Sequence, residues 1–248
     1  MSLLPRFSIS GMTNQSTLVE LAPGRWAHPS GALWLPQLRT ALLADVHLGY
    51  GWALRRRGQL GPVQDGGLRR KLLSIAEELR PASLVFLGDL VHAPRPTMQE
   101  REFVVSVLRE LAANTELICV RGNHDRGFER DYPELALTLV PEWSGAGLLA
   151  MHGDRIPASV DGHLTVGHLH PALGIVDDAG ASQKVPVFLT GERATVLPAF
   201  STLAAGFDVR SRLPDDLLAW FQSSEPCVVA ATGKRVVRLG SLARLRQT

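Results

Sequence analysis

Polar residues that could bind metal follow several apolar runs of this sequence. The runs 41–44, 84–87 and 117–120 each lead into aspartate, asparagine or histidine, and two later runs do the same. These candidate residues are, in chain order, Asp45, His47, Asp89, His92, Asn123, His124, Asp125, His152, His168 and His170. Carboxylate, amide and imidazole groups are ligands for divalent cations. The set is too large for one tetrahedral site, and it suits two metal ions about 3.5–4 Å apart that share one carboxylate.

The spacing of these residues favours side chains that converge. In Asp45-x-His47 and in His168-x-His170 the candidates alternate along the chain. Alternate residues of an extended segment point to the same side. Glycine lets the backbone turn sharply and approach a ligand closely. Glycines directly precede three of the candidates, which are Asp89, Asn123 and His168.

A structural role is the competing interpretation for each residue taken singly. A histidine, aspartate or asparagine after a strand is more often hydrogen-bonded core, a turn former or a helix cap than a ligand. Six of the eight histidines, however, stand in this pattern beside glycine, aspartate or another histidine. Independent structural roles do not explain that coincidence. His28 and His163 fit no such position, and for both we expect a structural role.

The elements that must position the candidates alternate in type. The runs 41–44, 84–87 and 117–120 are predicted strands, and apolar residues recur at helical spacing over 67–79 and 103–111 between them. This strand–helix order predicts a parallel sheet with helical crossovers. Because ligands bind at the carboxyl ends of adjacent strands in such sheets, we expect the polar residues to meet at one rim.

The second half of the chain has a different pattern of predicted elements. Short predicted strands follow one another over 148–151, 164–166, 173–176, 186–190, 194–197, 227–231 and 235–239. The first 36 residues hold two further predicted strands, near 17–21 and 32–35. Hairpin turns are predicted at 177–180 and at Thr232-Gly233. A mostly β second half that completes a sandwich of two sheets is the inference. We expect one domain over 1–248, with its core at about 18–240 and residues 1–16 disordered.

Composition and cysteine usage exclude several classes of protein. Hydrophobic residues make up 45% and charged residues 20% of the 248 residues, which is ordinary for a globular protein. No apolar run approaches the roughly 20 residues that span a bilayer, and the N-terminus lacks a secretory signal, so we expect a cytoplasmic protein without a membrane. Cys119 and Cys227 lie in apolar runs without a CxxC pattern, which argues against a thiolate metal site. No GxxxxGK[ST] segment supports ATP-driven chemistry.

Charge offers one candidate contact to nucleic acid. The net charge is only +2, although arginine greatly outnumbers lysine among the 26 basic residues. The cluster Arg55–Arg57 follows the first candidate loop and suits a DNA backbone; a solvated loop is an equally open interpretation. Tyr50 and Trp52 are the aromatic candidates near the site for stacking on single-stranded bases.

Together, these residues match a known family. The ordered blocks Asp45-x-His47, Gly88-Asp89-x-x-His92, Gly122-Asn123-His124-Asp125, His152 and Gly167-His168-x-His170 resemble those of the calcineurin-like metallophosphoesterases. A narrower likeness lies in the segments "LLADVHLGYGWALRRRG", "LVFLGDLVHAP", "VGHLHPAL" and "LPAFSTLAAGFDV". They resemble the DNA ligase-associated metallophosphoesterases of bacteria, over about residues 18 to 240.

The resemblance implies a fold and a role for each candidate. The fold would be an α/β, two-sheet αββα metallophosphoesterase-like sandwich. Asp45, His47 and His170 would hold a first metal, and Asn123, His152 and His168 a second, with Asp89 bridging the two. His124 would be the general acid that protonates the leaving oxygen, oriented or tuned by Asp125 or His92. An imidazole suits that role because its ordinary pKa lies near 6.5.

The function that follows is hydrolysis of a phosphoester by a hydroxide bound to two divalent metals. Mn²⁺ is the expected metal from this oxygen and imidazole ligand set, with Fe and Zn²⁺ as alternatives. The resemblance favours a nuclease or phosphodiesterase acting on DNA, including single-stranded DNA, in repair, with a DNA ligase and a helicase as partners. One alternative is a hydrolase of a small nucleotide or another phosphoester. Another is a metal-binding interaction subunit of a repair complex. The sequence does not indicate an oligomeric state.

Overall fold

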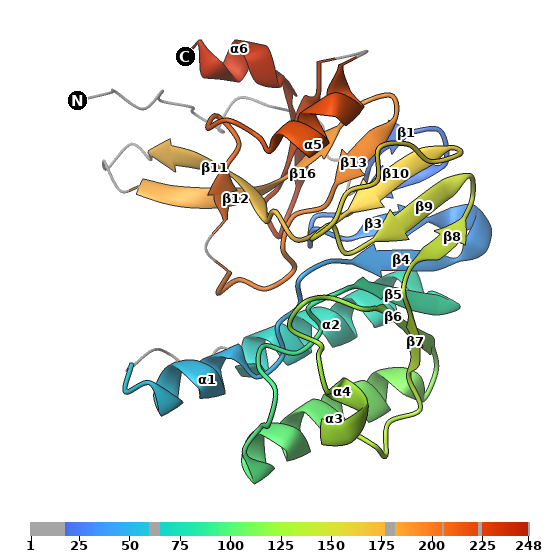
Figure 1. Cartoon of the computed structure of the whole chain (residues 1–248), viewed down its shortest axis with the longest axis vertical. Helices are drawn as coiled ribbons and strands as arrows, with labels where there is room; N and C mark the ends of the chain where they lie inside the picture. The colour runs from blue at the N-terminus through green and yellow to red at the C-terminus, as the bar shows by residue number, and fades with distance from the viewer. Residues whose placement is uncertain (1–17, 60–64, 177–181, 205, 223–224, 248) are drawn as a thin grey trace.

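The computed structural model describes residues 18–59, 65–176, 182–204, 206–222 and 225–247. The predicted disorder of 1–16 and the predicted turn at 177–180 lie outside these residues. Two β-sheets are stacked in the middle of the molecule, and helices lie on the outer side of each (Figure 1). The predicted fold class, an α/β sandwich of two sheets between helices, is confirmed.

The first sheet has the strand order β1-β2-β3-β4-β5-β6-β7. Its strands are β1 (Val19–Ala22), β2 (Arg25–Ala27), β3 (Leu33–Leu35), β4 (Thr40–Leu43), β5 (Ser83–Leu87), β6 (Glu116–Val120) and β7 (Thr138–Val140). The strands β4 to β7 are parallel, as the helical crossovers predict, whereas β1 to β4 form an antiparallel meander. The carboxyl ends of β4, β5 and β6 therefore lie side by side.

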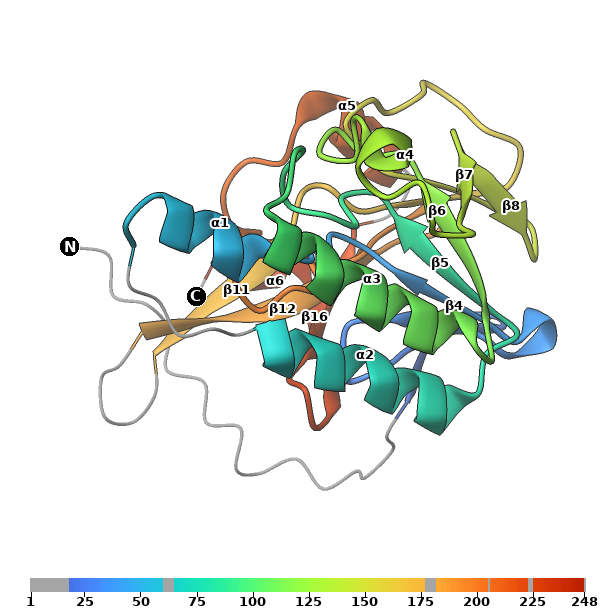
Figure 2. The same cartoon turned by 90° about the horizontal axis from the view of Figure 1, so that it is seen from below.

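Two long helices cover the outer face of this sheet (Figure 2). They are α2 (Asp65–Leu79) and α3 (Met98–Ala112). The helix α3 begins with a capping box, in which the Thr97 side chain accepts from the Glu100 N–H and the Glu100 side chain accepts from the Thr97 N–H. The apolar faces of both helices bury residues such as Leu72, Ile75 and Leu108 against the strands. Helical periodicity predicted both helices, although α3 begins five residues earlier than expected.

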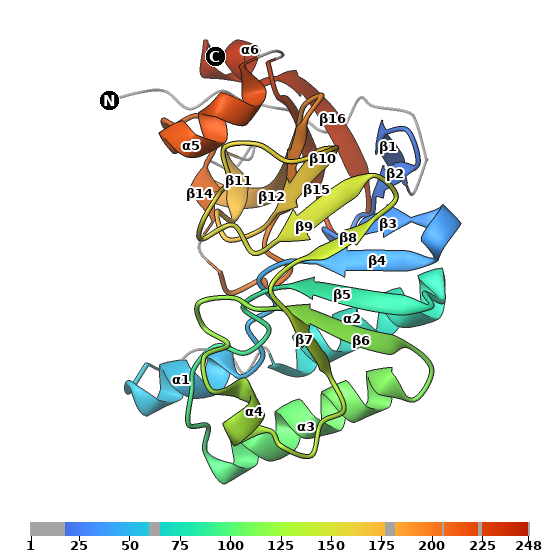
Figure 3. The same ribbon diagram turned by 45° about the vertical axis from the view of Figure 1, so that its right-hand side comes forward.

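The second sheet has the order β14-β11-β12-β13-β10-β9-β8, and β15 adds to it by pairing with β12 and β16. Its strands are β8 (Trp143–Gly145), β9 (Leu148–Met151), β10 (His163–Val166), β11 (Pro171–Val176), β12 (Ser182–Thr190), β13 (Ala194–Val196), β14 (Phe207–Asp208), β15 (Cys227–Ala231) and β16 (Val236–Ser241). Figure 3 shows this sheet above the first, with α5 (Asp215–Leu218) and α6 (Leu242–Arg246) beyond it. The strands β9, β10 and β13 are parallel, so the second sheet also presents carboxyl ends at one rim.

Three apolar clusters hold the layers together. One packs α2 and α3 on the first sheet, and another packs α5 and α6 on the second. The third lies between the sheets, where Leu42 and Val85 of the first meet Phe188 and Val229 of the second. Burying a Leu, Val or Phe side chain stabilises a fold by about 1.5–3 kcal/mol each, so the sheet–sheet interface fixes how the two rims face each other.

The sequence did not indicate several short elements. The 3₁₀ helices η2 (Pro36–Leu38) and η3 (Ala219–Phe221) and the helices α1 (Tyr50–Arg56) and α4 (Phe128–Asp131) were not expected. The helix α1 is a correction, because it places Arg55 and Arg56 on a helix, with Arg57 as its C-cap, rather than on a loop. Helices of one or two turns carry too few apolar residues to show a period. Among the described residues, no helix has both the length and the apolar character that crossing a bilayer requires.

Candidate metal centre

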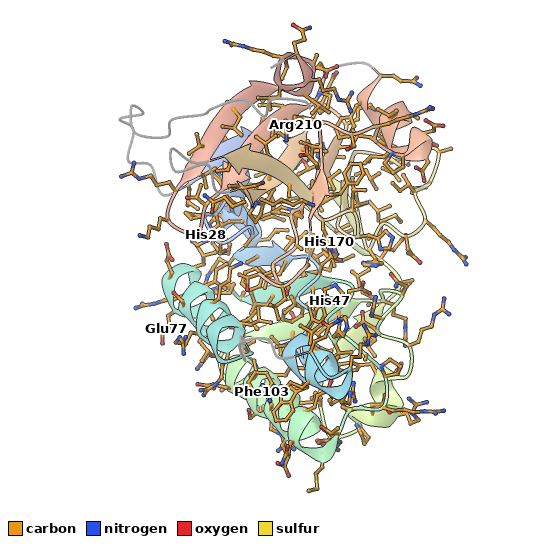
Figure 4. All side chains as sticks on the ribbon, turned by 90° about the vertical axis from the view of Figure 1, so that its left-hand side faces the viewer. His28, His47, Glu77, Phe103, His170 and Arg210 are labelled. Atoms are coloured by element: carbon orange, nitrogen blue, oxygen red, sulfur yellow. The ribbon has the colours of Figure 1, made fainter. Side chains whose placement is uncertain are left out.

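The loops that leave the parallel strands bring the predicted residues to one place. Backbone hydrogen bonds join these loops directly, from Asp45 N to Gly88 O at 3.3 Å and from His47 N to Asp89 O at 2.8 Å. Side chains join them too, because the Oδ2 atom of Asp45 accepts from the N–H of His168 at 2.9 Å. Loops of the first and second sheets therefore meet. Figure 4 shows His47 and His170 close together where the two layers join.

The backbone at these residues is unusual. Five of the candidates have φ between 50° and 62°, which are Asp45, His47, Asp89, His168 and His170. Such left-handed conformations are uncommon outside glycine and cluster at functional sites. The expectation that Asp45-x-His47 and His168-x-His170 are extended was therefore wrong. The side chains converge because each loop turns sharply, not because they alternate along a strand.

Glycine at 122 is required by a close approach. A Cβ atom on Gly122 would lie 2.3 Å from both the N and Oδ1 atoms of Asp89. Any larger residue would force the loops after β5 and β6 apart. This confirms that the glycine before Asn123 permits close approach of the backbone, as the sequence suggested.

A first group of donors consists of Asp45, His47 and His170, whose ligand atoms lie within 4.8 Å of one another. Asp45 is fully buried, and His47 is 4% exposed. The Oδ1 atom of Asp45 lies 3.2 Å from Nε2 of His170. The same Oδ1 atom is buried without a hydrogen-bond partner among the described residues. These are the three residues that the resemblance implied for one metal.

A second group consists of Asn123, His152 and His168, and the ligand atoms of the two histidines lie within 4.8 Å of one another and of a carboxylate oxygen of Asp89. The Oδ1 atom of Asn123 lies 2.9 Å from Nε2 of His152, and Nδ1 of His168 lies 3.0 Å from that same nitrogen. The Nδ1 atom of His152 lies 3.0 Å from the carbonyl oxygen of Leu87, which can only accept, so Nδ1 carries the proton. The Nε2 atom of neutral His152 then presents a lone pair to its neighbours.

Asp89 lies between the two groups. Its Oδ2 atom is 3.9 Å from Nε2 of His47, and its Oδ1 atom is 3.5 Å from Nε2 of His152. The side chain is almost completely buried, and Oδ1 also accepts from the N–H of His124 at 2.9 Å. One carboxylate thus faces donors of both groups, which is the placement that a bridging ligand needs.

His124 lies beside these groups, and a contact with a main-chain carbonyl group holds its ring in place. Its Nδ1 atom is 2.6 Å from the carbonyl oxygen of His92, and its Nε2 atom is 3.9 Å from Oδ2 of Asp89. The His92 ring lies at the same place, stacked on Tyr50 with centroids 4.0 Å apart. His47, His92 and His124 form a third set of nitrogen atoms within 4.8 Å. The contact with Tyr50 has no signal in the sequence.

Asp125 has a different contact from the one expected. Its side chain is 2% exposed and accepts from three backbone N–H groups, those of Leu90, Val91 and Gly122. Burial raises the pKa of Asp125, while the Gly122 N–H opposes that change. The carboxylate therefore ties the loops after β5 and β6 together, and His124 receives its contact from the His92 backbone instead.

Electrostatics keep several of these histidines neutral. Burial lowers the pKa of His47 to about 2, helped by the nearby charges of other histidines when protonated. Burial also lowers the pKa of His92 to about 4 and lowers that of His168. The pKa of His170 is raised, because the adjacent Asp45 carboxylate and the charge of Asp89 outweigh the effect of burial. Neutral imidazole is the form that binds metal.

The arginine cluster lies beside the site on α1. Nη1 of Arg56 makes a 3.2 Å ion pair with the buried carboxylate of Glu100. The Arg55 guanidinium lies 4.7 Å from the centroid of the Trp52 ring, so that face of Trp52 is covered. Arg57 is exposed at the end of the helix. The three arginines thus have three different environments.

The remaining candidates lie away from the centre. His163 is buried and hydrogen-bonded to Oγ1 of Thr195 at 2.9 Å and near the carbonyl oxygen of Glu192 at 3.1 Å. His28 lies 3.2 Å from the Glu78 carboxylate. Both have the structural surroundings that we expected. The Cys119 thiol is buried behind Asp125, and burial raises its pKa well above the usual value, which makes it a poor nucleophile.

Comparison with known proteins agrees with this geometry. Residues 38–184 match the family model of the calcineurin-like phosphoesterases, and the chain therefore belongs to that family. It is a metal-dependent phosphoesterase with candidate metal-binding groups at the rims of its two sheets.

The fold of the chain is also similar to that of solved structures. The crystal structure of Pseudomonas putida nuclease MPE is similar with a TM-score of 0.65 and 21% sequence identity, over 90% of this chain and 98% of that chain. This likeness shows the fold. Yfce, a phosphoesterase from E. coli, has a TM-score of 0.39 and 18% identity, over 77% of this chain and 86% of that chain. No curated protein matches the chain.

Proposed function

We propose that this chain is a two-metal phosphodiesterase that cleaves DNA. The observation that carries the proposal is the placement of Asp89 between two groups of metal donors, with His124 beside it. One group is Asp45, His47 and His170, and the other is Asn123, His152 and His168. Two cations sharing a carboxylate are suited to in-line displacement at phosphorus.

The donor atoms fit divalent cations. Among the residues that the structure describes, the buried Oδ1 atom of Asp45 has no hydrogen-bond donor, although histidine nitrogens lie 3.2–3.9 Å from it. In the second group, the lone pair on His152 Nε2 faces Asn123 Oδ1 at 2.9 Å, and two acceptors at that distance repel each other. A positive ion at each place would relieve both conflicts. Two bound divalent ions would supply an activated water and offset the negative charge of the phosphate oxygens.

The chain's own residues supply the proton. The His124 ring is oriented by its Nδ1–H, which donates to the His92 carbonyl oxygen. Nε2 is then the nitrogen available to protonate the leaving oxygen, and His124 acts as an acid only when both ring nitrogens are protonated. Asp125 contributes indirectly, because it holds the loop on which Asn123 and His124 lie.

The finer parts of the proposal rest on chemistry and on resemblance. Mn²⁺ suits carboxylate, amide and imidazole ligands without thiolate, and Fe or Zn²⁺ are the alternatives. The segments that resemble the DNA ligase-associated metallophosphoesterases support DNA as substrate, single-stranded DNA included, and a DNA ligase or helicase as partners in cytoplasmic DNA repair. Arg55 and Arg57 are the substrate contacts that we propose from the cluster, since Arg56 is engaged by Glu100.

A hydrolase of small nucleotides or other phosphoesters is the second candidate. The same donors would serve it, and little affinity for DNA would mark it. A metal-binding interaction subunit is a third, and the oriented His124 argues against it, because a scaffold needs no proton donor beside metals. Unchanged repair in cells that carry His124→Ala would favour the scaffold.

The decisive experiment measures hydrolysis of three substrates by metal-stripped protein before and after addition of Mn²⁺. The substrates are single-stranded DNA, bis-p-nitrophenyl phosphate and p-nitrophenyl phosphate. We expect cleavage of the DNA and the diester to depend on Mn²⁺, and DNA cleavage to be lost in His124→Ala, which excludes a contaminating nuclease. Hydrolysis of the monoester alone would overturn the proposal.

A further inference from the structure

A cavity lies between α2 and the second sheet, apart from the metal donors. Its volume is about 520 Å³, within the range of small-ligand sites. Its polar lining includes His28, Lys71, Glu78, Lys184, Thr202 and Thr232, and we call it the lysine pocket. None of its lining residues belongs to the metal donor groups.

A smaller cavity has residues of both the lysine pocket and the metal centre in its lining. It has a volume of about 70 Å³ and is lined by His170, Ser201 and Gly206, among others. Lys184, Pro186 and Thr202 line both cavities, so the two are neighbours on the same part of the surface. In Figure 4, His28 and His170 lie at about the same level, where the upper sheet meets the layer below.

The charge of the lysine pocket favours an anion. The chain has three lysines, and two of them, Lys71 and Lys184, line this pocket. The Lys71 ammonium donates to the Phe200 carbonyl oxygen at 2.7 Å, lies 3.9 Å from the Phe200 ring centroid and makes no ion pair within the described residues. Burial lowers the pKa of Lys71 to about 8. The one carboxylate that lines the pocket, Glu78, lies 3.2 Å from Nε2 of His28, and its side chain is about half exposed to solvent.

The backbone couples this pocket to the metal donors. Lys71 binds Phe200, whose N–H donates to the Ala44 carbonyl oxygen at 2.7 Å. The next N–H, of Ser201, donates to the Asp45 carbonyl oxygen at 3.2 Å. A series of hydrogen bonds therefore runs from Lys71 through the segment Phe200–Ser201 to the main chain of Asp45. These bonds fix the position of Lys71 relative to the loop that carries Asp45.

We propose that the lysine pocket binds a phosphate of the same DNA strand that is cleaved, at a position away from the scissile bond. The strand would run from the metal centre past His170 and Lys184 into the pocket. This inference rests on the proposed function, since it extends the substrate site of that activity. It distinguishes a polynucleotide from a small phosphoester, because only a chain of several nucleotides reaches both places.

The test compares Lys184→Ala with Arg109→Ala, a control that removes one exposed positive charge from α3, outside both cavities. Ser74→Glu, a third variant, adds a negative charge at the pocket wall. Binding of fluorescent oligothymidylates, short and long, is measured in EDTA over a range of salt concentrations. Hydrolysis of bis-p-nitrophenyl phosphate with Mn²⁺ is measured in parallel on all four proteins.

We expect Lys184→Ala to weaken binding of the long oligonucleotide several-fold and to reduce its salt slope by about 0.7, the value for one phosphate contact on a single strand. Ser74→Glu should weaken it further, and Arg109→Ala should resemble wild type. Hydrolysis of the small diester should be unchanged throughout. Equal binding by Lys184→Ala and Arg109→Ala would overturn the proposal that the lysine pocket binds phosphate. It would not affect the proposal that the chain is a phosphodiesterase. Absent hydrolysis in wild type would instead contradict the proposed function, and the binding comparison would still decide the pocket.

Discussion

The Nδ1 atom of His124 lies 2.6 Å from the main-chain carbonyl oxygen of His92. A carbonyl oxygen accepts only, so this contact fixes the ring and assigns a proton to Nδ1. The nitrogen on the other side, Nε2, then faces the Asp89 carboxylate at 3.9 Å. A main-chain atom, which substitution does not remove, thus orients the residue that we propose as general acid.

His124→Ala should impair catalysis in a way that depends on the leaving group. A general acid contributes about 10²- to 10⁴-fold, and an alkoxide such as the deoxyribose oxygen needs that proton more than p-nitrophenolate does. We expect DNA cleavage to fall by that factor and cleavage of bis-p-nitrophenyl phosphate to fall much less. Metal content, measured by mass spectrometry, should match wild type. Equal losses on both substrates would argue against proton donation.

Asp89→Ala should remove both metal and activity. The carboxylate faces nitrogens of both donor groups and accepts from the His124 N–H, so its loss affects every part of the site. Substituting a residue that only supports a metal ligand lowers metal affinity or activity by about 10- to 100-fold. We expect at least that loss when the carboxylate of Asp89 itself is removed. Metal per protein is the direct measurement. A variant with the full metal content of wild type would refute the bridging role.

We expect Arg56 to stabilise the fold, and Arg55 and Arg57 to act mainly in binding DNA. Arg56→Ala leaves the buried Glu100 carboxylate without its arginine, and because Arg56 is partly exposed we expect a loss of about 1–3 kcal/mol in the free energy of unfolding. Arg55→Ala and Arg57→Ala should leave stability near wild type. Urea titration compares all three.

For the affinity for single-stranded DNA, we expect Arg55 and Arg57 to matter more than Arg56. The double variant of Arg55 and Arg57 should weaken binding and flatten its dependence on salt. Replacing all three arginines adds the stability loss to that effect. A salt slope identical to wild type in the double variant would mean that these arginines only face solvent.

His163 should make the metal-free protein less stable in acid. Burial lowers its pKa to about 4 from 6.5, so between these values the unfolded chain binds a proton that the folded chain does not. Stability attributable to His163 is therefore full above about pH 6.5 and falls as the pH drops toward 4, by at most about 3 kcal/mol. Urea unfolding in EDTA at pH 7 and pH 4.5 measures it.

His163→Gln provides the comparison, because the other buried histidines contribute equally to both proteins. The variant should be less stable than wild type at pH 7, since it loses the ring's contacts with Thr195 and Glu192. Its loss of stability between pH 7 and 4.5 should be smaller. An identical loss in both proteins would show that His163 does not titrate in this range.

The helices and strands that the sequence predicted correctly are those with a clear hydrophobic period. Leu72, Ile75 and Leu108 lie on apolar helical faces, and the runs that became β4, β5 and β6 are short and wholly apolar. Such patterns report burial directly. The helix α1 has no comparable face, and Tyr50 and Arg56 are held by partners distant in sequence, His92 and Glu100. Local sequence carries no record of such contacts.

The sequence by itself determined which residues meet at the candidate metal centre, because polar residues that end parallel strands must gather at one rim. It also determined the family, through the order of those residues along the chain. The tertiary structure decided how they meet. The left-handed backbone at Asp45 and His170, the use of Asp125 as an acceptor for three N–H groups and the His92 carbonyl contact to His124 all depend on loops from different strands packing together. Each of these hydrogen bonds has a main-chain group as one partner, and main-chain groups are the same for every residue type, so only the folded chain reveals the contacts.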